Sequence, residues 1–169
     1  MRKSFAIGMT FATVLAFACF SVRAEDDDLE KLAQALSDAS VSLEQGIKAS
    51  EAEGKPISGK FEVEDGALQL SVYTMKADGF AEVIVDHKAG STKKSEAITD
   101  ADDLKEAKGQ GEAMAKATLP LAAAVASAVN ANNGFRAVSA VPMLDGGQPM
   151  ASITLMKGEE VKKVTEKLD

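Results

Sequence analysis

The side chains that most often carry chemistry in proteins are scarce in this sequence. It has one histidine, His87, and one cysteine, Cys19, among 169 residues. Zinc and related metals need several clustered histidine or cysteine ligands, and a serine or cysteine nucleophile needs a partner base. His87 directly follows Asp86 and has no second histidine to act with. We therefore expect a solvated residue at a strand end, no catalytic residue and no enzyme activity.

Two acidic runs, Glu25–Asp28 and Asp100–Asp103, carry carboxylates that could bind calcium. Neither run has the alternating spacing of a calcium-binding loop. Both precede helical patterns, and carboxylates at such positions stabilise the free N–H groups of a helix start. We expect the runs to begin helices, and we predict no metal or cofactor.

Two other patterns have a structural explanation as well. Gly109 and Gly111 have the spacing of a nucleotide-binding loop, but no strand precedes them and no Lys-Ser/Thr pair follows. Exported methionine-rich proteins can bind copper(I), but several methionines here fall at periodic positions, which favours core packing. The methionines concerned are Met75, Met114, Met143, Met150 and Met156.

The N-terminal segment has the pattern of a secretory signal peptide. Residues 1–3 are positively charged, Phe5–Phe20 is almost wholly apolar, and Val22 and Ala24 occupy the two positions that a signal peptidase reads. An apolar run of about 16 residues is short for a membrane-spanning helix, which needs roughly 20. We expect cleavage near Ala24, a periplasmic or secreted protein without cysteine, and no stable membrane anchor after cleavage.

The overall charge argues against a nucleic-acid partner. The chain has 19 Lys and Arg residues against 26 Asp and Glu residues, which gives a net charge of −7. Nucleic-acid binding normally depends on a basic surface. We therefore expect no nucleic-acid partner.

The first half of the chain predicts a helix followed by three strands. Apolar residues recur every three or four positions from Leu29 to Ile47, which is one face of a helix. Ser42-Leu43-Glu44-Gln45 is a capping-box sequence, which predicts a break in that helix near Ser42. Alternating patterns over 60–64, 68–72 and 82–86 then predict strands, with a hairpin turn at Asp65-Gly66.

The second half repeats this order of elements. A helical pattern begins near Leu104 and is interrupted at Leu119-Pro120. Strand patterns over 135–141, 150–157 and 160–168 follow, with a turn at Asp145-Gly146-Gly147. Leu36–Leu43 can be aligned with Met114–Leu121, and Ser71–Lys76 with Ser152–Lys157, which favours an internal duplication.

These patterns predict an α+β fold of two repeats, residues 25–90 and 104–169, joined by a polar connector over 91–103. In each repeat we expect one helix, broken in places, to pack on a three-stranded antiparallel sheet. Each unit is near the lower size limit for an independent core, so we expect the repeats to share a core or a continuous sheet.

The first repeat resembles a PepSY domain. The resemblance covers most of residues 36–94 and is carried by the helix start at Val41–Ile47, the hairpin at Asp65-Gly66 and the segment Glu82–Gly90. That family closes a strand with Val-x-Val-Asp and has a Gly four residues later. The matching residues here are Val83, Val85, Asp86 and Gly90. We expect Asp86 to cap the turn that leads to Gly90 rather than to take part in chemistry. The second repeat resembles the family more weakly, because the chain stops at Asp169 before a closing Gly.

The resemblance implies a non-catalytic function. PepSY modules occur in the propeptides of thermolysin-type metalloproteases and in exported bacterial proteins, where they inhibit or chaperone peptidases or serve as interaction modules. We therefore expect an exported protein-binding module that inhibits or modulates a peptidase by covering its cleft with a hairpin tip. The expected tips are Glu64–Ala67 and Leu144–Gln148. The expected contact residues are Glu64, Asp65 and Gly66 in the first tip, and Asp145, Gly146 and Gly147 in the second. The alternatives are an envelope protein that binds a small ligand or metal ion, and an envelope structural protein without a discrete ligand.

Overall fold

A computed structural model describes residues 22–169, with side chains from Asp28 onward. The predicted signal peptide falls mainly on residues 1–21, which lie outside the described part of the chain. Its predicted cleavage site, near Ala24, falls in the first turn of helix α1 (Val22–Ala35).

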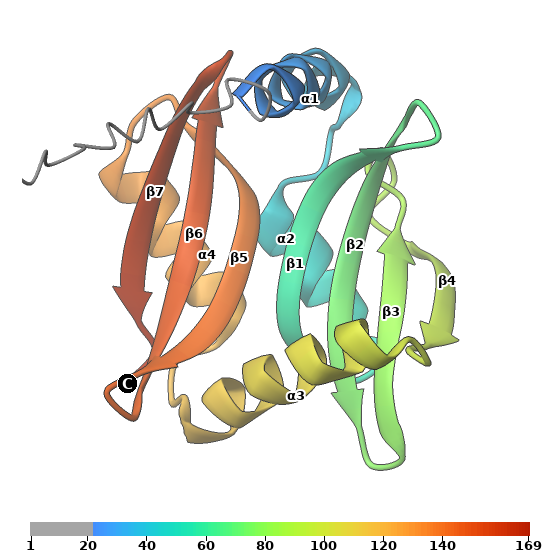
Figure 1. Ribbon diagram of the computed structural model, residues 1–169, viewed down its shortest axis with the longest axis vertical. Helices are drawn as coiled ribbons and strands as arrows, with labels where there is room; N and C mark the ends of the chain where they lie inside the picture. The colour runs from blue at the N-terminus through green and yellow to red at the C-terminus, as the bar shows by residue number, and fades with distance from the viewer. Residues whose placement is uncertain (1–21) are drawn as a thin grey trace, which may run out of the picture.

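The described residues form one antiparallel sheet of seven strands, with helices on both faces (Figure 1). The strand order is β4-β3-β2-β1-β5-β6-β7. The strands are β1 (Lys55–Glu64), β2 (Ala67–Lys76), β3 (Gly79–Val85), β4 (Thr92–Ala97), β5 (Arg136–Asp145), β6 (Gln148–Lys157) and β7 (Glu160–Lys167).

The prediction of two repeats, each with its own three-stranded sheet, is therefore wrong, although the α+β class and the antiparallel pairing are confirmed. Strand β1 pairs with β5 through Gly59–Ala140 and Lys60–Ser139, which makes the sheet continuous. A seventh strand, β4, comes from residues within the expected polar connector. It escaped prediction because an exposed edge strand needs no alternation of apolar residues.

Helices α2 (Leu43–Ala49) and α4 (Leu121–Ala131) pack on one face of the sheet. Leu43 and Ile47 of α2 lie against Gly59 of β1, where a Cβ atom would come within 3.1 Å of Ile47. The buried residues of β2 and β6 on this face include Leu70 and Ile153. These apolar contacts form the core that holds α2 and α4 on the sheet.

Helix α3 (Ala101–Lys116) crosses the opposite face of the sheet (Figure 1). Its Gly111 lies against Phe80 and Met75. Its start confirms the prediction for the second acidic run, because the Asp100 carboxylate accepts hydrogen bonds from the N–H groups of Asp102 and Asp103.

No single helix among residues 22–169 has the length and apolar character to cross a membrane. Helices α3 and α4 meet that test only as a pair bent by 85°.

The predicted break before α2 is also confirmed. Ser42 is the N-cap of α2, and its side chain forms a capping box with Gln45. Before it the chain makes a 3-10 turn, η1 (Leu36–Asp38), and another, η2 (Ser50–Ala52), follows α2. The helical pattern from Leu29 to Ile47 is thus two helices, and α1 lies across the end of the sheet (Figure 1).

Arg136 at the start of β5 holds the segment between α1 and α2 in place. Its guanidinium donates hydrogen bonds to the carbonyl oxygens of Leu36, at 3.0 Å, of Ala39, at 3.3 Å, and of Val41. The same group lies 5.0 Å from the ring centroid of Phe61. Burial lowers the pKa of Arg136, and the negative charge of Glu44 opposes that shift. Arg136 thus links the second half of the chain to the first.

Candidate functional site

The two predicted contact tips lie at opposite ends of the sheet. Glu64, Asp65 and Gly66 form the turn between β1 and β2, and Asp145, Gly146 and Gly147 form the turn between β5 and β6. Because β1 and β5 are neighbouring antiparallel strands, their ends point in opposite directions (Figure 1). The two tips cannot enter one cleft together, so they are separate candidate sites.

The β1–β2 tip is polar. Asp65 and Gly66 have φ angles of 51° and 77°, which fit a two-residue hairpin turn. Gln69 donates a hydrogen bond to the Glu64 carboxylate at 2.7 Å. The exposed large apolar residues in the described chain all lie elsewhere. This tip can therefore contact a partner protein through charge and hydrogen bonds, but it has little apolar surface.

The β5–β6 tip has an apolar patch beside it. Val141, Met143 and Leu144 are exposed to 39%, 41% and 36%, and the one other large apolar side chain of comparable exposure in residues 28–169 is Val161. The turn that follows has positive φ angles at Gly146 and Gly147, and neither glycine has a neighbour near the position of a Cβ atom. We call Val141, Met143 and Leu144 the β5 patch.

A groove of about 750 Å³ separates the β5 patch from α3. Asp102, Glu106 and Glu112 line the α3 side, together with Lys105. The apolar wall therefore faces a wall with more carboxylates than ammonium groups. At the end of α3, Lys116 donates a hydrogen bond to the Gly147 carbonyl at 3.4 Å, which links the helix to the turn. A partner segment that fits this groove should combine apolar and basic side chains.

Sequence reasoning selected the turn but missed the β5 patch. Val141 is the last residue of the predicted strand over 135–141, and Met143 is among the methionines for which the sequence favours core packing. Leu144 belongs to the predicted tip, and it places an apolar side chain next to Met143 and directly before a turn, which is the signal that could have extended the site to Met143 and Val141. Consecutive apolar residues there cannot all face one core.

The free edges of the sheet carry lysines. Lys93 and Lys94 lie on β4, and Lys162, Lys163 and Lys167 lie on β7. Charged residues on edge strands disfavour the pairing of an additional strand. The hairpin and its groove are therefore better candidates for a protein contact than either edge.

The four residues that carry the PepSY resemblance lie in strand β3 (Gly79–Val85) and in the turn that follows it. Val83 and Val85 are buried in β3, and the Asp86 carboxylate accepts hydrogen bonds from the N–H groups of Lys88, at 2.8 Å, and Ala89, at 3.0 Å. These bonds lower the pKa of Asp86 to about 2. Gly90 has a φ of 74° and donates to the Asp86 carbonyl at 2.7 Å. The predicted turn-capping role of Asp86 is confirmed.

His87 is less exposed than the sequence suggested. Its carbonyl oxygen accepts hydrogen bonds from the N–H groups of Ser40, at 2.9 Å, and Val41, at 3.0 Å. Its Nδ1 atom is buried and has no hydrogen-bond partner among residues 28–169. In the described chain, no group of three or more His, Cys, Asp or Glu residues is arranged to hold a metal ion.

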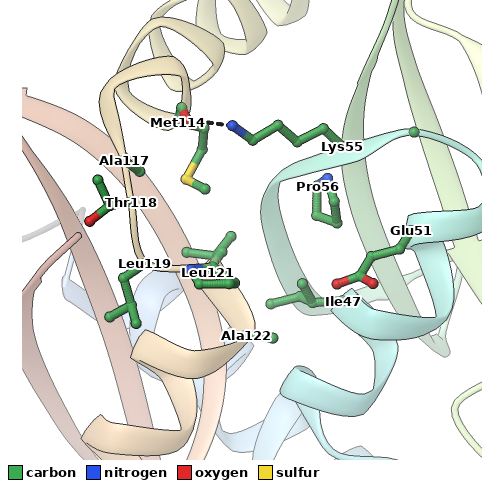
Figure 2. A pocket seen from close by; sticks show the side chains of 12 residues that line it. Ile47, Glu51, Lys55, Pro56, Met114, Ala117, Thr118, Leu119, Leu121 and Ala122 are labelled. Carbon is green, nitrogen blue, oxygen red and sulfur yellow. Dashed lines mark hydrogen bonds between the residues drawn. The ribbon is translucent and has the colours of Figure 1, made fainter. Parts of the chain in front are cut away.

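A second candidate site is a pocket of about 330 Å³ between α2, the start of β1 and the α3–α4 connection (Figure 2). Ile47, Pro56 and Leu121 supply apolar walls. The Lys55 ammonium donates a hydrogen bond to the Met114 carbonyl at 2.6 Å, and Glu51 stands on the α2 side of the opening. The size and the apolar lining suit a small molecule.

Comparison with protein-family models, curated proteins and solved structures gives no match to this chain.

Proposed function

We propose that this protein is an exported, non-catalytic module that binds another protein through its β5–β6 hairpin and thereby modulates a peptidase. The observation that carries the proposal is the β5 patch. Its three side chains line one groove together with charged residues of α3, and an exposed apolar patch rimmed by polar residues is one mark of an interaction site. Methionine and leucine also adapt well to a partner surface.

The mode of action that we propose is occlusion of a peptidase cleft. The β5–β6 turn ends in two glycines with open space around them, so the tip is narrow enough to enter a cleft. Met143 and Leu144 would then contact apolar subsites, and the carboxylates of α3 would face basic groups at the rim. The PepSY resemblance of residues 36–94 supports a peptidase as the partner, and the predicted signal peptide supports a periplasmic or secreted location.

An inhibition assay tests this proposal. The purified protein is titrated into a thermolysin-type metalloprotease, and hydrolysis of a fluorogenic peptide is measured. We expect the wild-type protein to slow hydrolysis, and the double variant Met143→Ser/Leu144→Ser to be at least tenfold weaker. Val161→Ser is the matched control, because Val161 is exposed to 37% on another strand.

Two results would refute the proposal. One is the absence of both inhibition and binding with wild-type protein at concentrations up to about 100 μM. Typical specific complexes have much lower dissociation constants than this concentration. The other is equal inhibition by the wild-type protein and the Met143→Ser/Leu144→Ser variant. Mass spectrometry of the exported protein tests the location, with a new N-terminus near Glu25 as the expected result.

The second candidate function is the binding of a small apolar ligand in the pocket of Figure 2. The observation that favours it is a volume of about 330 Å³ with mainly apolar walls. A thermal-shift screen of small apolar compounds is the test. A compound that binds there should raise the melting temperature of the wild-type protein but not that of Ala117→Leu, in which the larger side chain fills the pocket.

A further inference from the structure

A small polar cavity lies between α3 and the sheet, separate from the pocket of Figure 2. Its volume is about 120 Å³. Ser58, Ser71 and Ser139 supply hydroxyl groups from three neighbouring strands, and Tyr73 lies beside them. A cavity of this size is well above the minimum that a water molecule needs, so it can also hold a small polar group of a ligand.

Gln110 of α3 gives this cavity an unpaired hydrogen-bond acceptor. The residue is only 8% exposed and lines the cavity. Its Oε1 atom is buried and has no hydrogen-bond partner in the part of the chain that the structure describes. Burial of an unpaired acceptor costs free energy, and a group that donates a hydrogen bond into the cavity would remove that cost.

The charges around the cavity favour a positively charged donor. Asp103 and Glu106 line it from α3. Lys60 also lines it, but its ammonium lies 2.7 Å from a carboxylate oxygen of Glu62 and is therefore paired. Burial, and then the negative charges of Asp103, Glu82, Glu62 and Glu106, raise the pKa of Tyr73 to about 12. The cavity thus attracts cations and disfavours anions.

We propose that this cavity binds a primary ammonium group carried on a short alkyl stem. The ammonium has three donors, which can pair with Gln110 Oε1, a carboxylate of α3 and a serine hydroxyl. The stem would lie against Val141, which also lines the cavity. The cavity shares Glu106, Gln110 and Val141 with the groove beside the β5 patch. The ammonium can therefore come from a free amine or from a lysine of a chain in that groove.

The single tyrosine of the protein reports on this cavity. Tyr73 is the only tyrosine and the chain has no tryptophan, so tyrosine fluorescence comes from the site alone. The protein is titrated with n-butylammonium, and with n-butanol and n-butyrate as neutral and anionic controls of the same shape. We expect a saturable change with n-butylammonium only. No saturable change, or an equal response to n-butanol or n-butyrate, would overturn the proposal.

Variants of α3 test the assignment of residues. Gln110→Met removes the unpaired acceptor, so it should weaken n-butylammonium binding at least tenfold and raise the melting temperature of the free protein. Glu106→Gln should also weaken binding. Glu112→Gln is the matched control, because Glu112 lines the groove but not the cavity. The affinity of this variant for n-butylammonium should stay within about twofold of the wild-type value. Unchanged affinity in both Gln110→Met and Glu106→Gln would overturn the proposal.

The peptide acetyl-Leu-Lys-Leu-amide distinguishes the two sources of the ammonium. Tighter binding than n-butylammonium, lost in Met143→Ser, identifies a lysine of a bound chain. Equal or weaker binding identifies a free amine, and both results support an ammonium site. The n-butylammonium titration is independent of peptidase inhibition, because neither Met143 nor Leu144 lines the cavity.

Discussion

The substitution Arg136→Met should destabilise the protein by about 3 kcal/mol. The guanidinium forms three hydrogen bonds to carbonyl oxygens of the α1–α2 segment and lies above the ring of Phe61. A hydrogen bond to a charged donor contributes about 1.5–3 kcal/mol when buried. Because Arg136 is only partly buried, we take about 1 kcal/mol for each bond, and the methionine side chain retains most of the packing.

Urea denaturation followed by far-UV circular dichroism measures this loss. For a chain of this size, about 3 kcal/mol corresponds to a decrease of roughly 6–12 °C in melting temperature. Arg136→Lys is the control, since lysine keeps the positive charge near Phe61 but cannot reach all three carbonyls. It should lose about half as much.

Ordinary surface substitutions change the free energy of unfolding by no more than about 0.5 kcal/mol. A change within that range for Arg136→Met would contradict this reasoning. The fluorescence of Tyr73 supplies a second probe in the first half of the chain. Because Arg136 links the two halves, the fluorescence and circular dichroism transitions should coincide in the wild-type protein. Separate transitions in the wild-type protein would show that the halves unfold independently.

Three other predictions concern single residues. Gly46→Ala should destabilise the protein by about 1–3 kcal/mol, because the new Cβ would come within 2.4 Å of the buried Leu70 side chain. Gly109→Ala has open space around it and should stabilise α3 by about 0.5–1 kcal/mol. Chemical denaturation measures the free energy of unfolding of both variants. Tyr73 should ionise near pH 12 in absorbance titrations at alkaline pH. Its raised pKa contributes stability that is present below pH 10 and lost as the pH rises through about 12, and an ionisation near 10 in folded protein would refute the cause given. The pKa of Asp86 is lowered, so its contribution to stability is present above pH 3.8, the ordinary pKa of the group, and is lost as the pH falls through about 2. Carboxyl NMR titration should place the midpoint of the Asp86 ionisation near 2. Asp86→Asn should remove that resonance without a change in the titration of Tyr73.

Local features of the fold could be predicted from the sequence because they depend on neighbouring residues. The cap at Ser42 joins residues three positions apart, and the cap at Asp100 uses N–H groups of the next turn. The hairpin turns at Asp65-Gly66 and Gly146-Gly147 require positive φ angles, which glycine adopts readily. The same reasoning identified the turn-forming role of Asp86.

The candidate surfaces could be predicted only in part. The turn Asp145-Gly146-Gly147 is visible in the sequence, but the exposure of Met143 is not, because an apolar residue in a strand pattern is normally assigned to the core. Gln110 gave no signal either, since a glutamine in a polar helix is normally solvated. Its burial results from the position of α3 across the sheet.

The sequence by itself determined the class of the fold, the order of most elements and the polar character of the turns, since periodicity and capping act over a few residues. The tertiary structure decided that β1 pairs with β5, that residues 92–97 complete the sheet as β4, and that Arg136 bonds to carbonyls 95 to 100 residues earlier in the chain. Each of these contacts joins groups that are distant in sequence. Local periodicity cannot specify such pairs, because they form only when the chain folds to bury the apolar surface of its elements in one core.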